Sequence, residues 1–295
     1  MNPVVLFFAS GDSLYFGAAL LLLIVATSPY LSGRWVLGCR NIAAWVALAT
    51  IVMACPPFPW VVDAIFLGVF ALWFVESNWS ETRYVSVGSR RIMASVLVLL
   101  LLVLPGVELS HRAVPKIVGA PSDHLVVIGD SISSGIGLPV PAWPLVMQQI
   151  TGVPVKNLAR AGANTIEAQA MATAITPEDL VVLLEIGGND MLAGVPSGEF
   201  GKALDALLSK INAPGRTVVM FELPLFPNRI AYGQIQRRLA AKYGVWLIPK
   251  RFFVEVIGAA NATSDGLHLS DAGTHQMATL VAQALSPVLK TAVSH

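Results

Sequence analysis

The stretch His124-Leu125-Val126-Val127-Ile128-Gly129-Asp130-Ser131 decides the fold of the larger part of this chain. It is a short apolar run, rich in β-branched residues, that ends in Gly-Asp-Ser. Such a run predicts a buried strand of a parallel sheet. A strand that stops at Ser131 places the serine hydroxyl at the carboxyl edge of the sheet, where open α/β sheets bind their ligands.

Strand-like and helix-like segments alternate after this point. The predicted strands are Leu125–Ile128, Val153–Leu158, Leu180–Ile186, Thr217–Glu222 and Val245–Ile248. The predicted helices are Trp143–Ile150, Thr165–Ala174, Phe200–Ile211, Asn228–Tyr243 and Asp271–Leu285. Alternation at this spacing implies right-handed βαβ units and therefore an α/β domain with a mostly parallel sheet covered by helices.

Charge is distributed unevenly along the chain. Of 295 residues, 55% are hydrophobic and only 13% are charged, against about 25% charged in ordinary soluble domains. Residues 1–109 hold five Lys or Arg and five Asp or Glu, whereas residues 110–295 hold fourteen and thirteen. We therefore expect a transmembrane region at 1–109, a polar linker at 110–122 and a soluble domain at 123–295. The net charge of +1 gives no support for nucleic-acid binding.

About four segments of the first part approach the length that a bilayer requires. They are Leu14–Leu31, Trp35–Cys55, Trp60–Val75 and Ile92–Val107. The prolines of residues 56–59 force a turn between the second and the third. The third segment is near the short limit, so a re-entrant or interfacial helix is the alternative there.

The basic residues of the loops predict an orientation. Arg34 lies in the first loop, and Arg83, Arg90 and Arg91 lie in the third. Positively charged loops stay in the cytoplasm. With four spans in a bacterial-type inner membrane, the soluble domain is then expected on the outer, periplasmic side.

Three polar motifs carry candidate chemistry. They are Gly129-Asp130-Ser131, Gly187-Gly188-Asn189-Asp190 and Asp265-Gly266-Leu267-His268. A serine hydroxyl is a weak nucleophile that needs a neighbouring base, which a histidine can supply. The structural alternatives are a helix cap at Ser131, turns at Asn189-Asp190 and Asp265-Gly266, and a surface histidine.

Gly11-Asp12-Ser13-Leu14 repeats the first motif near the amino terminus. No convincing strand precedes it, and a motif counts only in its structural context. We interpret Ser13 as a membrane-interface or helix-start residue.

The soluble part resembles the SGNH (GDSL-type) family of serine hydrolases from roughly Asp123 to Val288. The three motifs and Ala161-Gly162-Ala163-Asn164 match the four family blocks in order. Ala142-Trp143-Pro144 and Leu223–Pro227 look like the bacterial thioesterase/lysophospholipase branch, to which the membrane region is an addition. The resemblance implies a three-layer α/β domain and an oxyanion hole formed by Ser131 N–H, Gly162 N–H and the Asn189 side chain. Ser131 is then the expected nucleophile, His268 the base and Asp265 the residue that orients it.

We therefore expect a membrane-anchored serine esterase that acts on lipid-like acyl esters or thioesters. Leu223, Leu225 and Phe226 are the candidate substrate-binding residues. The alternatives are O-acetyl groups on envelope or exported polysaccharide, acyl transfer through the same residues, and a noncatalytic accessory membrane protein. No His/Cys/Asp cluster has the spacing of metal ligands, so neither metal nor cofactor is expected.

Overall fold

The computed structural model describes residues 3–78, 87–135, 141–266 and 268–290. The chain divides into two compact units. The sheet unit comprises Met1–Leu6, Ala113–Leu225 and Ala231–His295, and the helical unit comprises Phe7–Arg112 and Phe226–Ile230. Arg83, on which the orientation depends in part, and Leu267 lie outside the described residues.

The first part of the chain is entirely helical within the described residues. Its elements are α1 (Pro3–Ala9), α2 (Asp12–Thr27), η1 (Ser28–Tyr30), α3 (Arg34–Met53), α4 (Trp60–Asn78) and α5 (Val87–Leu109). Four of these segments, Asp12–Tyr30, Arg34–Met53, Trp60–Asn78 and Gly88–Leu109, are long and apolar enough to cross a membrane. The third is 19 residues long, three residues longer than the predicted Trp60–Val75.

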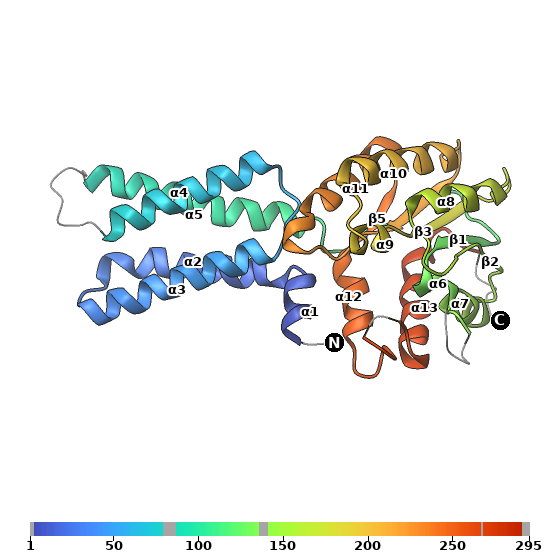
Figure 1. Ribbon diagram of the computed structural model, residues 1–295, viewed down its shortest axis with the longest axis horizontal. Helices are drawn as coiled ribbons and strands as arrows, with labels where there is room; N and C mark the ends of the chain where they lie inside the picture. The colour runs from blue at the N-terminus through green and yellow to red at the C-terminus, as the bar shows by residue number, and fades with distance from the viewer. Residues whose placement is uncertain (1–2, 79–86, 136–140, 267, 291–295) are drawn as a thin grey trace. The chain divides into compact units, whose positions relative to one another are not determined.

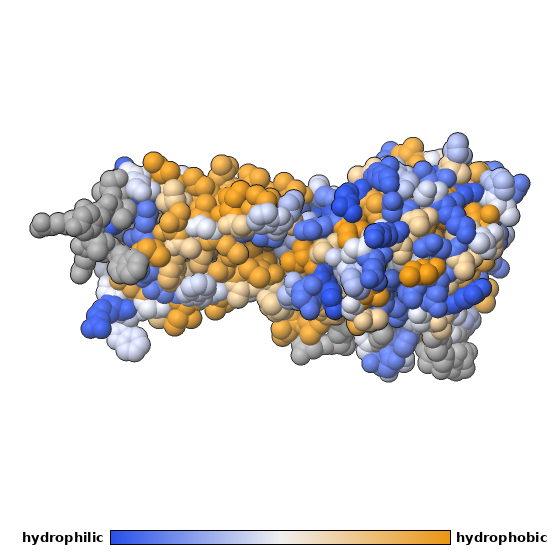
Figure 2. Space-filling model, turned by 45° about the horizontal axis from the view of Figure 1, so that its top comes forward, coloured by the Kyte–Doolittle hydropathy of each residue, from blue (hydrophilic) through white to orange (hydrophobic). Residues whose placement is uncertain are grey.

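The helices of the helical unit pack through small and apolar side chains. Helix α2 packs against α3 and α5, and α4 packs against α5. Gly17 of α2 permits a close approach, because a Cβ there would lie 2.7 Å from the carbonyl oxygen of Ala47 in α3. Large apolar side chains such as Trp45 and Leu99 nevertheless remain more than half exposed. Figure 2 shows this apolar surface over the helices, and it is the surface expected of segments that face lipid.

Arg40 is buried near the start of α3, with 5% of its surface exposed. Its guanidinium group donates hydrogen bonds to Ser28 Oγ, to the Ser77 carbonyl oxygen and to Asn78 Oδ1. The last two groups end α4, where a helix carries partial negative charge. Arg40 therefore ties the ends of α2 and α4 to α3.

The sheet unit alternates strands and helices, as the sequence predicts. Its strands are β1 (Leu125–Gly129), β2 (Val155–Asn157), β3 (Val181–Glu185), β4 (Thr217–Phe221) and β5 (Trp246–Ile248). The helices that cover them are α7 (Trp143–Thr151), α8 (Thr165–Met171), α10 (Ser197–Ile211), α11 (Ile230–Tyr243), α12 (Lys250–Gly258) and α13 (Asp271–Leu285). The short helix α6 (Ser131–Ser134) follows β1, and the short helix α9 (Gly188–Leu192) follows β3. Two short 3-10 helices are also present, η2 (Ala172–Ala174) and η3 (Pro227–Arg229).

All neighbouring strands are parallel, in the order β2-β1-β3-β4-β5. Every residue of β1, β3 and β4 is buried, because helices cover both faces. Figure 1 shows α8, α10 and α11 on one face and α7, α12 and α13 on the other. In this strand order the chain reverses direction across the sheet between β1 and β3, which is where such folds open a ligand crevice.

Two helical features differ from the predictions. They are helix α12 and the carboxyl end of the first transmembrane candidate. The sequence analysis assigned no element to Lys250–Gly258. It also extended the first segment to Leu31, whereas α2 ends at Thr27 and the short helix η1 follows. Pro29 explains the second difference, since proline favours the first turn of a new helix over the interior of a long one.

Asp179 lies just before the amino end of β3, at the opposite end of the sheet from the carboxyl ends of β1 and β3. Its side chain is 4% exposed and accepts hydrogen bonds from the Thr176 N–H, 2.8 Å, and from Lys156 Nζ, 3.0 Å. His124 Nε2 lies 2.7 Å from its other oxygen. Burial alone would raise the pKa of Asp179, but these partners outweigh burial and lower the pKa to about 2.

Asp179→Asn is expected to reduce the free energy of unfolding by about 2 kcal/mol at neutral pH. A carboxyl whose pKa is lower in the folded state than in the unfolded state stabilises the fold above the unfolded pKa. This contribution disappears as pH falls from 3.8 through about 2. Calorimetric Tm values of wild type and variant should therefore converge over that range. Asp123→Asn removes the exposed partner of the same histidine and serves as the control, with a much smaller effect. A Tm difference that does not depend on pH would contradict the role of the Asp179 charge.

Candidate active site

Ser131 begins helix α6 directly after β1. Asp130 is the N-cap residue of this helix, because its Oδ1 accepts a hydrogen bond of 3.0 Å from the Ile132 N–H. The alternative that Ser131 caps the helix is therefore wrong, because Asp130 occupies the capping position. Ser131 is partly exposed, and its hydroxyl makes no hydrogen bond to any residue that the structure describes. This leaves the oxygen available at the carboxyl edge of the sheet.

Asp265 and His268 form a pair in the loop between α12 and α13. His268 Nδ1 lies 2.6 Å from Asp265 Oδ2, and the His268 N–H donates to Asp265 Oδ1 over 2.8 Å. The loop is closed by the Ser264 N–H, which donates to the His268 carbonyl oxygen. The two contacts fix both the ring and the backbone of His268. With Nδ1 engaged, Nε2 is the ring nitrogen left for a second partner.

The imidazole of His268 lies within electrostatic range of the Ser131 turn. Burial raises the pKa of Asp130, and the Ile132 N–H and the charge of His268 act in the opposite direction. Asp130 precedes Ser131 in the chain, so this electrostatic interaction indicates that His268 lies near the Ser131 turn. Among the described residues no hydrogen bond joins Ser131 Oγ to His268, as is common before a substrate draws such groups together.

Gly162 lies in the loop between β2 and α8 with φ of +71°, a conformation that favours glycine. A Cβ at this position would meet nothing within 4 Å, so the space above the backbone is open. The Arg160 N–H donates to the Gly129 carbonyl oxygen over 3.1 Å and ties the loop to the end of β1. The exposed backbone of Gly162 is thereby held beside the strand that leads to Ser131.

Asn189 connects these segments from helix α9. Its Nδ2 donates to the Ala163 carbonyl oxygen, 2.9 Å, and to Asp130 Oδ2, 3.2 Å. An amide nitrogen has two hydrogens, and both are engaged here. Donation to a substrate oxygen requires Asn189 to exchange one of these bonds, and the longer bond to Asp130 is the weaker of the two.

Two buried carboxyl groups lie beside the site. Glu185 was not singled out from the sequence, and the only structural alternative considered for Asp190 was a turn. Glu185 ends β3, and Asp190 Oδ2 accepts from both the N–H and the hydroxyl of Thr165, each over 2.9 Å. The signal for Glu185 was its position in the apolar run Val181–Ile186. A charged residue almost never lies in a fully buried strand without a polar partner.

The candidate substrate-binding residues are mostly packed inside the protein. Leu223 and Leu225 are 8% and 5% exposed, whereas Phe226 is 46% exposed. Leu223 lies close to Gly187 of the Gly187-Gly188-Asn189-Asp190 motif, since a Cβ built at Gly187 would be 3.1 Å from Leu223 Cδ1. Leu223 therefore shapes the site through packing.

Ser13 lies in the first turn of α2, as a helix-start residue should. It is fully buried, and its hydroxyl has no hydrogen-bond partner among the described residues. The neighbouring Asp12 forms an ion pair of 2.5 Å with Arg112, whose guanidinium group stacks over Tyr15. This copy of the motif serves the packing of the helix.

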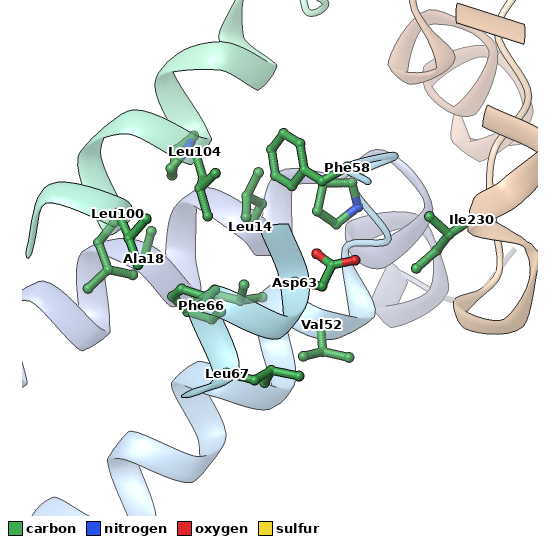
Figure 3. A pocket seen from close by; sticks show the side chains of 14 residues that line it. Leu14, Ala18, Val52, Phe58, Asp63, Phe66, Leu67, Leu100, Leu104 and Ile230 are labelled. Carbon is green, nitrogen blue, oxygen red and sulfur yellow. The ribbon is translucent and has the colours of Figure 1, made fainter. Parts of the chain in front are cut away.

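A separate cavity of about 130 Å³ lies in the helical unit (Figure 3). Its lining is apolar except for the carboxylate of Asp63, and it includes Leu14, Ala18, Phe66 and Leu104. None of the candidate catalytic residues lines it. In the described part of the chain, no group of three or more His, Cys, Asp or Glu side chains is placed to hold a metal ion.

Several known proteins are similar to this chain. The profile of the GDSL-like Lipase/Acylhydrolase family matches residues 127–276, a segment that contains Ser131, Gly162, Asn189, Asp265 and His268. Esterase TesA from Pseudomonas aeruginosa is 28% identical over 185 residues, which cover 58% of this chain and 91% of that protein. An arylesterase from Vibrio mimicus is 31% identical over 184 residues, with 56% and 88% covered. A crystal structure of TesA matches with a TM-score of 0.50 at 27% identity, over 56% of this chain and 99% of that chain.

Proposed function

The chain belongs to the GDSL-like lipase/acylhydrolase family, and from this membership we propose that Ser131, His268 and Asp265 are its catalytic residues. The SGNH-type α/β fold and the class of serine ester hydrolase predicted from the sequence are confirmed. The observation that carries the proposal is the Asp265–His268 pair of 2.6 Å within electrostatic range of the Ser131 turn.

In the proposed reaction, His268 Nε2 removes the proton from Ser131 Oγ as that oxygen attacks the acyl carbonyl carbon. The tetrahedral intermediate collapses when the ester bond breaks, and His268 gives the proton to the leaving alcohol or thiol. Water then attacks the acyl-enzyme with His268 as base, which releases the acid and restores Ser131. Asp265 holds the ring and stabilises its charged form.

The negative oxygen of the intermediate requires donors, and we assign them to the Ser131 N–H, the Gly162 N–H and Asn189. Ser131 N–H is at the start of a helix, where a backbone donor has no partner within the helix. The left-handed backbone and open space at Gly162 support its role. Each such donor contributes about 3–4 kcal/mol to transition-state stabilisation in acyl-transfer sites.

We also propose that residues 1–109 form a membrane region, 110–122 a linker and 123–295 the hydrolase domain, with that domain on the outer side of the membrane. The four long apolar helices support the membrane region. Arg34 at the start of α3 and Arg90 and Arg91 at the start of α5 support the orientation.

The substrate class that we favour is a lipid-like acyl ester or thioester. The apolar helices carry the large exposed apolar surface that faces lipid, and they would hold the enzyme where such substrates reside. Acetyl esters of envelope polysaccharide are the alternative, and acyl transfer is a variant of the same chemistry.

Hydrolysis of p-nitrophenyl esters from acetyl to palmitoyl by the detergent-purified chain tests this choice. We expect kcat/KM to rise with acyl length, because each methylene buried in an acyl site contributes up to about 0.8 kcal/mol. Ser131→Ala provides the background rate. Activity confined to acetyl esters would contradict the lipid assignment and favour polysaccharide deacetylation.

A further inference from the structure

Asp130 and Glu185 form a pair of buried carboxyl groups beneath the Ser131 turn. The sheet register pairs Gly129 of β1 with Glu185 of β3, so Asp130 follows immediately beside Glu185. The two residues are 5% and 6% exposed. The Asp130 N–H points at Glu185 Oε2 over 3.4 Å, and the two carboxyl groups are close enough to interact electrostatically.

The remaining partners of this pair are neutral. Glu185 Oε2 accepts from Ser133 Oγ over 2.9 Å, and Ser133 Oγ in turn accepts from Trp143 Nε1 over 3.1 Å. Asp130 accepts from the Ile132 N–H and from Asn189 Nδ2. Within the described part of the chain no Lys or Arg side chain contacts either carboxyl group. The other charged groups that face the pair are Asp190 of α9 and His268.

A hydrogen bond between two carboxyl groups needs a proton on one of them. Two adjacent buried carboxylates without a cation would also be strongly unfavourable. Burial, and then the charge of Asp130, raise the pKa of Glu185 well above its usual range, whereas the hydrogen bond from Glu185 favours the charged form of Asp130. Both oxygens of Asp130 accept hydrogen bonds, whereas among the described residues only Oε2 of Glu185 does. The proton is therefore assigned to Glu185 Oε1.

We propose that protonated Glu185 is a positioning residue for the catalytic site, because it donates a hydrogen bond to Asp130 and holds that residue as a carboxylate. Asp130 then fixes the Ser131 turn through the Ile132 N–H and orients the Asn189 amide. The inference rests on the proposed function for its effect on activity, but the protonation state itself is independent of that function.

A proton on Glu185 predicts that the activity depends on pH. Removal of the Glu185 proton at high pH places a second negative charge beside Asp130, breaks their hydrogen bond and displaces the Asp130 carboxylate that orients the Ser131 turn and Asn189. Activity should therefore fall on the alkaline side. Glutamine at position 185 reproduces the protonated state, since its Oε1 can accept from Ser133 and Asp130 N–H while its Nε2 donates to Asp130.

The experiment compares Glu185→Gln, Glu185→Ala and wild type, with Glu199→Gln on exposed α10 as the matched control. We expect Glu185→Gln to keep kcat within about threefold, with its alkaline limb moved up by at least about one pH unit. Glu185→Ala, which leaves Ser133 and Asp130 without this partner, should lose about 10²-fold in kcat. The alkaline shift in Glu185→Gln, which a change in packing would not produce, separates positioning from simple loss of packing.

Infrared difference spectroscopy supplies a readout without activity. Wild type and Glu199→Gln should show the C=O stretch of a buried protonated carboxyl group at neutral pH, and Glu185→Gln should lack it. Absence of the band in wild type, or its persistence in Glu185→Gln, would overturn the proposal. So would a Glu185→Gln variant as impaired as Glu185→Ala. A wild-type band in a protein that hydrolyses no ester would refute the proposed function while upholding the protonation of Glu185.

Discussion

Ester hydrolysis is expected to fall by about 10⁴-fold or more when Ser131 is replaced with alanine. The replacement removes the only atom that forms the acyl bond in the proposed mechanism, and the oxyanion donors alone leave little catalysis. The fold should survive, because the Ser131 hydroxyl makes no hydrogen bond to the described residues and Asp130 caps the helix. The measurement is kcat on the best ester of the acyl series, with Tm as the check on folding.

Ser13→Ala is the matched control for that variant, since Ser13 stands in the other Gly-Asp-Ser sequence. It removes a buried hydroxyl without a partner among the described residues, a change that is nearly neutral or slightly stabilising. Activity should therefore stay at the wild-type level. Loss of activity in Ser13→Ala, together with retention in Ser131→Ala, would show that the site has been assigned to the wrong serine.

The sheet was predictable because its strands are buried on both faces and therefore read as apolar runs. Residues 125–128 and 217–222 were assigned within about a residue of β1 and β4. Helix α13 was assigned with its observed bounds, since its apolar residues recur with the helical period and Ser270 caps it. Helix α12 was missed, because its nine residues directly follow a strand and Pro249 and read as one more loop.

The positions of the candidate catalytic residues were predictable, but their contacts were not. Asp265 and His268 are three residues apart, so their pairing follows from local geometry. Asn189 is different. Its bonds to Asp130 and Ala163 depend on three segments that meet only after the sheet forms.

The contacts of Glu185 were also not predictable from the sequence. A single glutamate in the run Val181–Ile186 signals a buried polar group, but only the register of β1 against β3 reveals that its partner is another carboxyl group. Sequence patterns identify which residues are unusual for their element. The interaction partners of these residues are determined by the tertiary structure.

His268→Ala is expected to lower kcat by about 10⁴-fold or more, because Ser131 then has no base to accept its proton and no acid to protonate the leaving group. Stability should change little. The side chain is 29% exposed, and its ring contacts the half-exposed Asp265, so no buried charge is left without a partner. The double variant with Ser131→Ala should be no slower than either single variant, since the two residues act as one unit.

His275→Ala supplies the control for this histidine. His275 lies in α13, its side chain is 58% exposed, and its Nδ1 is 3.6 Å from Asp271 Oδ1, so it too has an aspartate neighbour. That pair lies on a helix surface, where an ion pair contributes little. Activity should therefore persist in His275→Ala. If His275→Ala were inactive and His268→Ala active, the base would belong to α13, and the loop that joins Asp265 to His268 would be a structural turn.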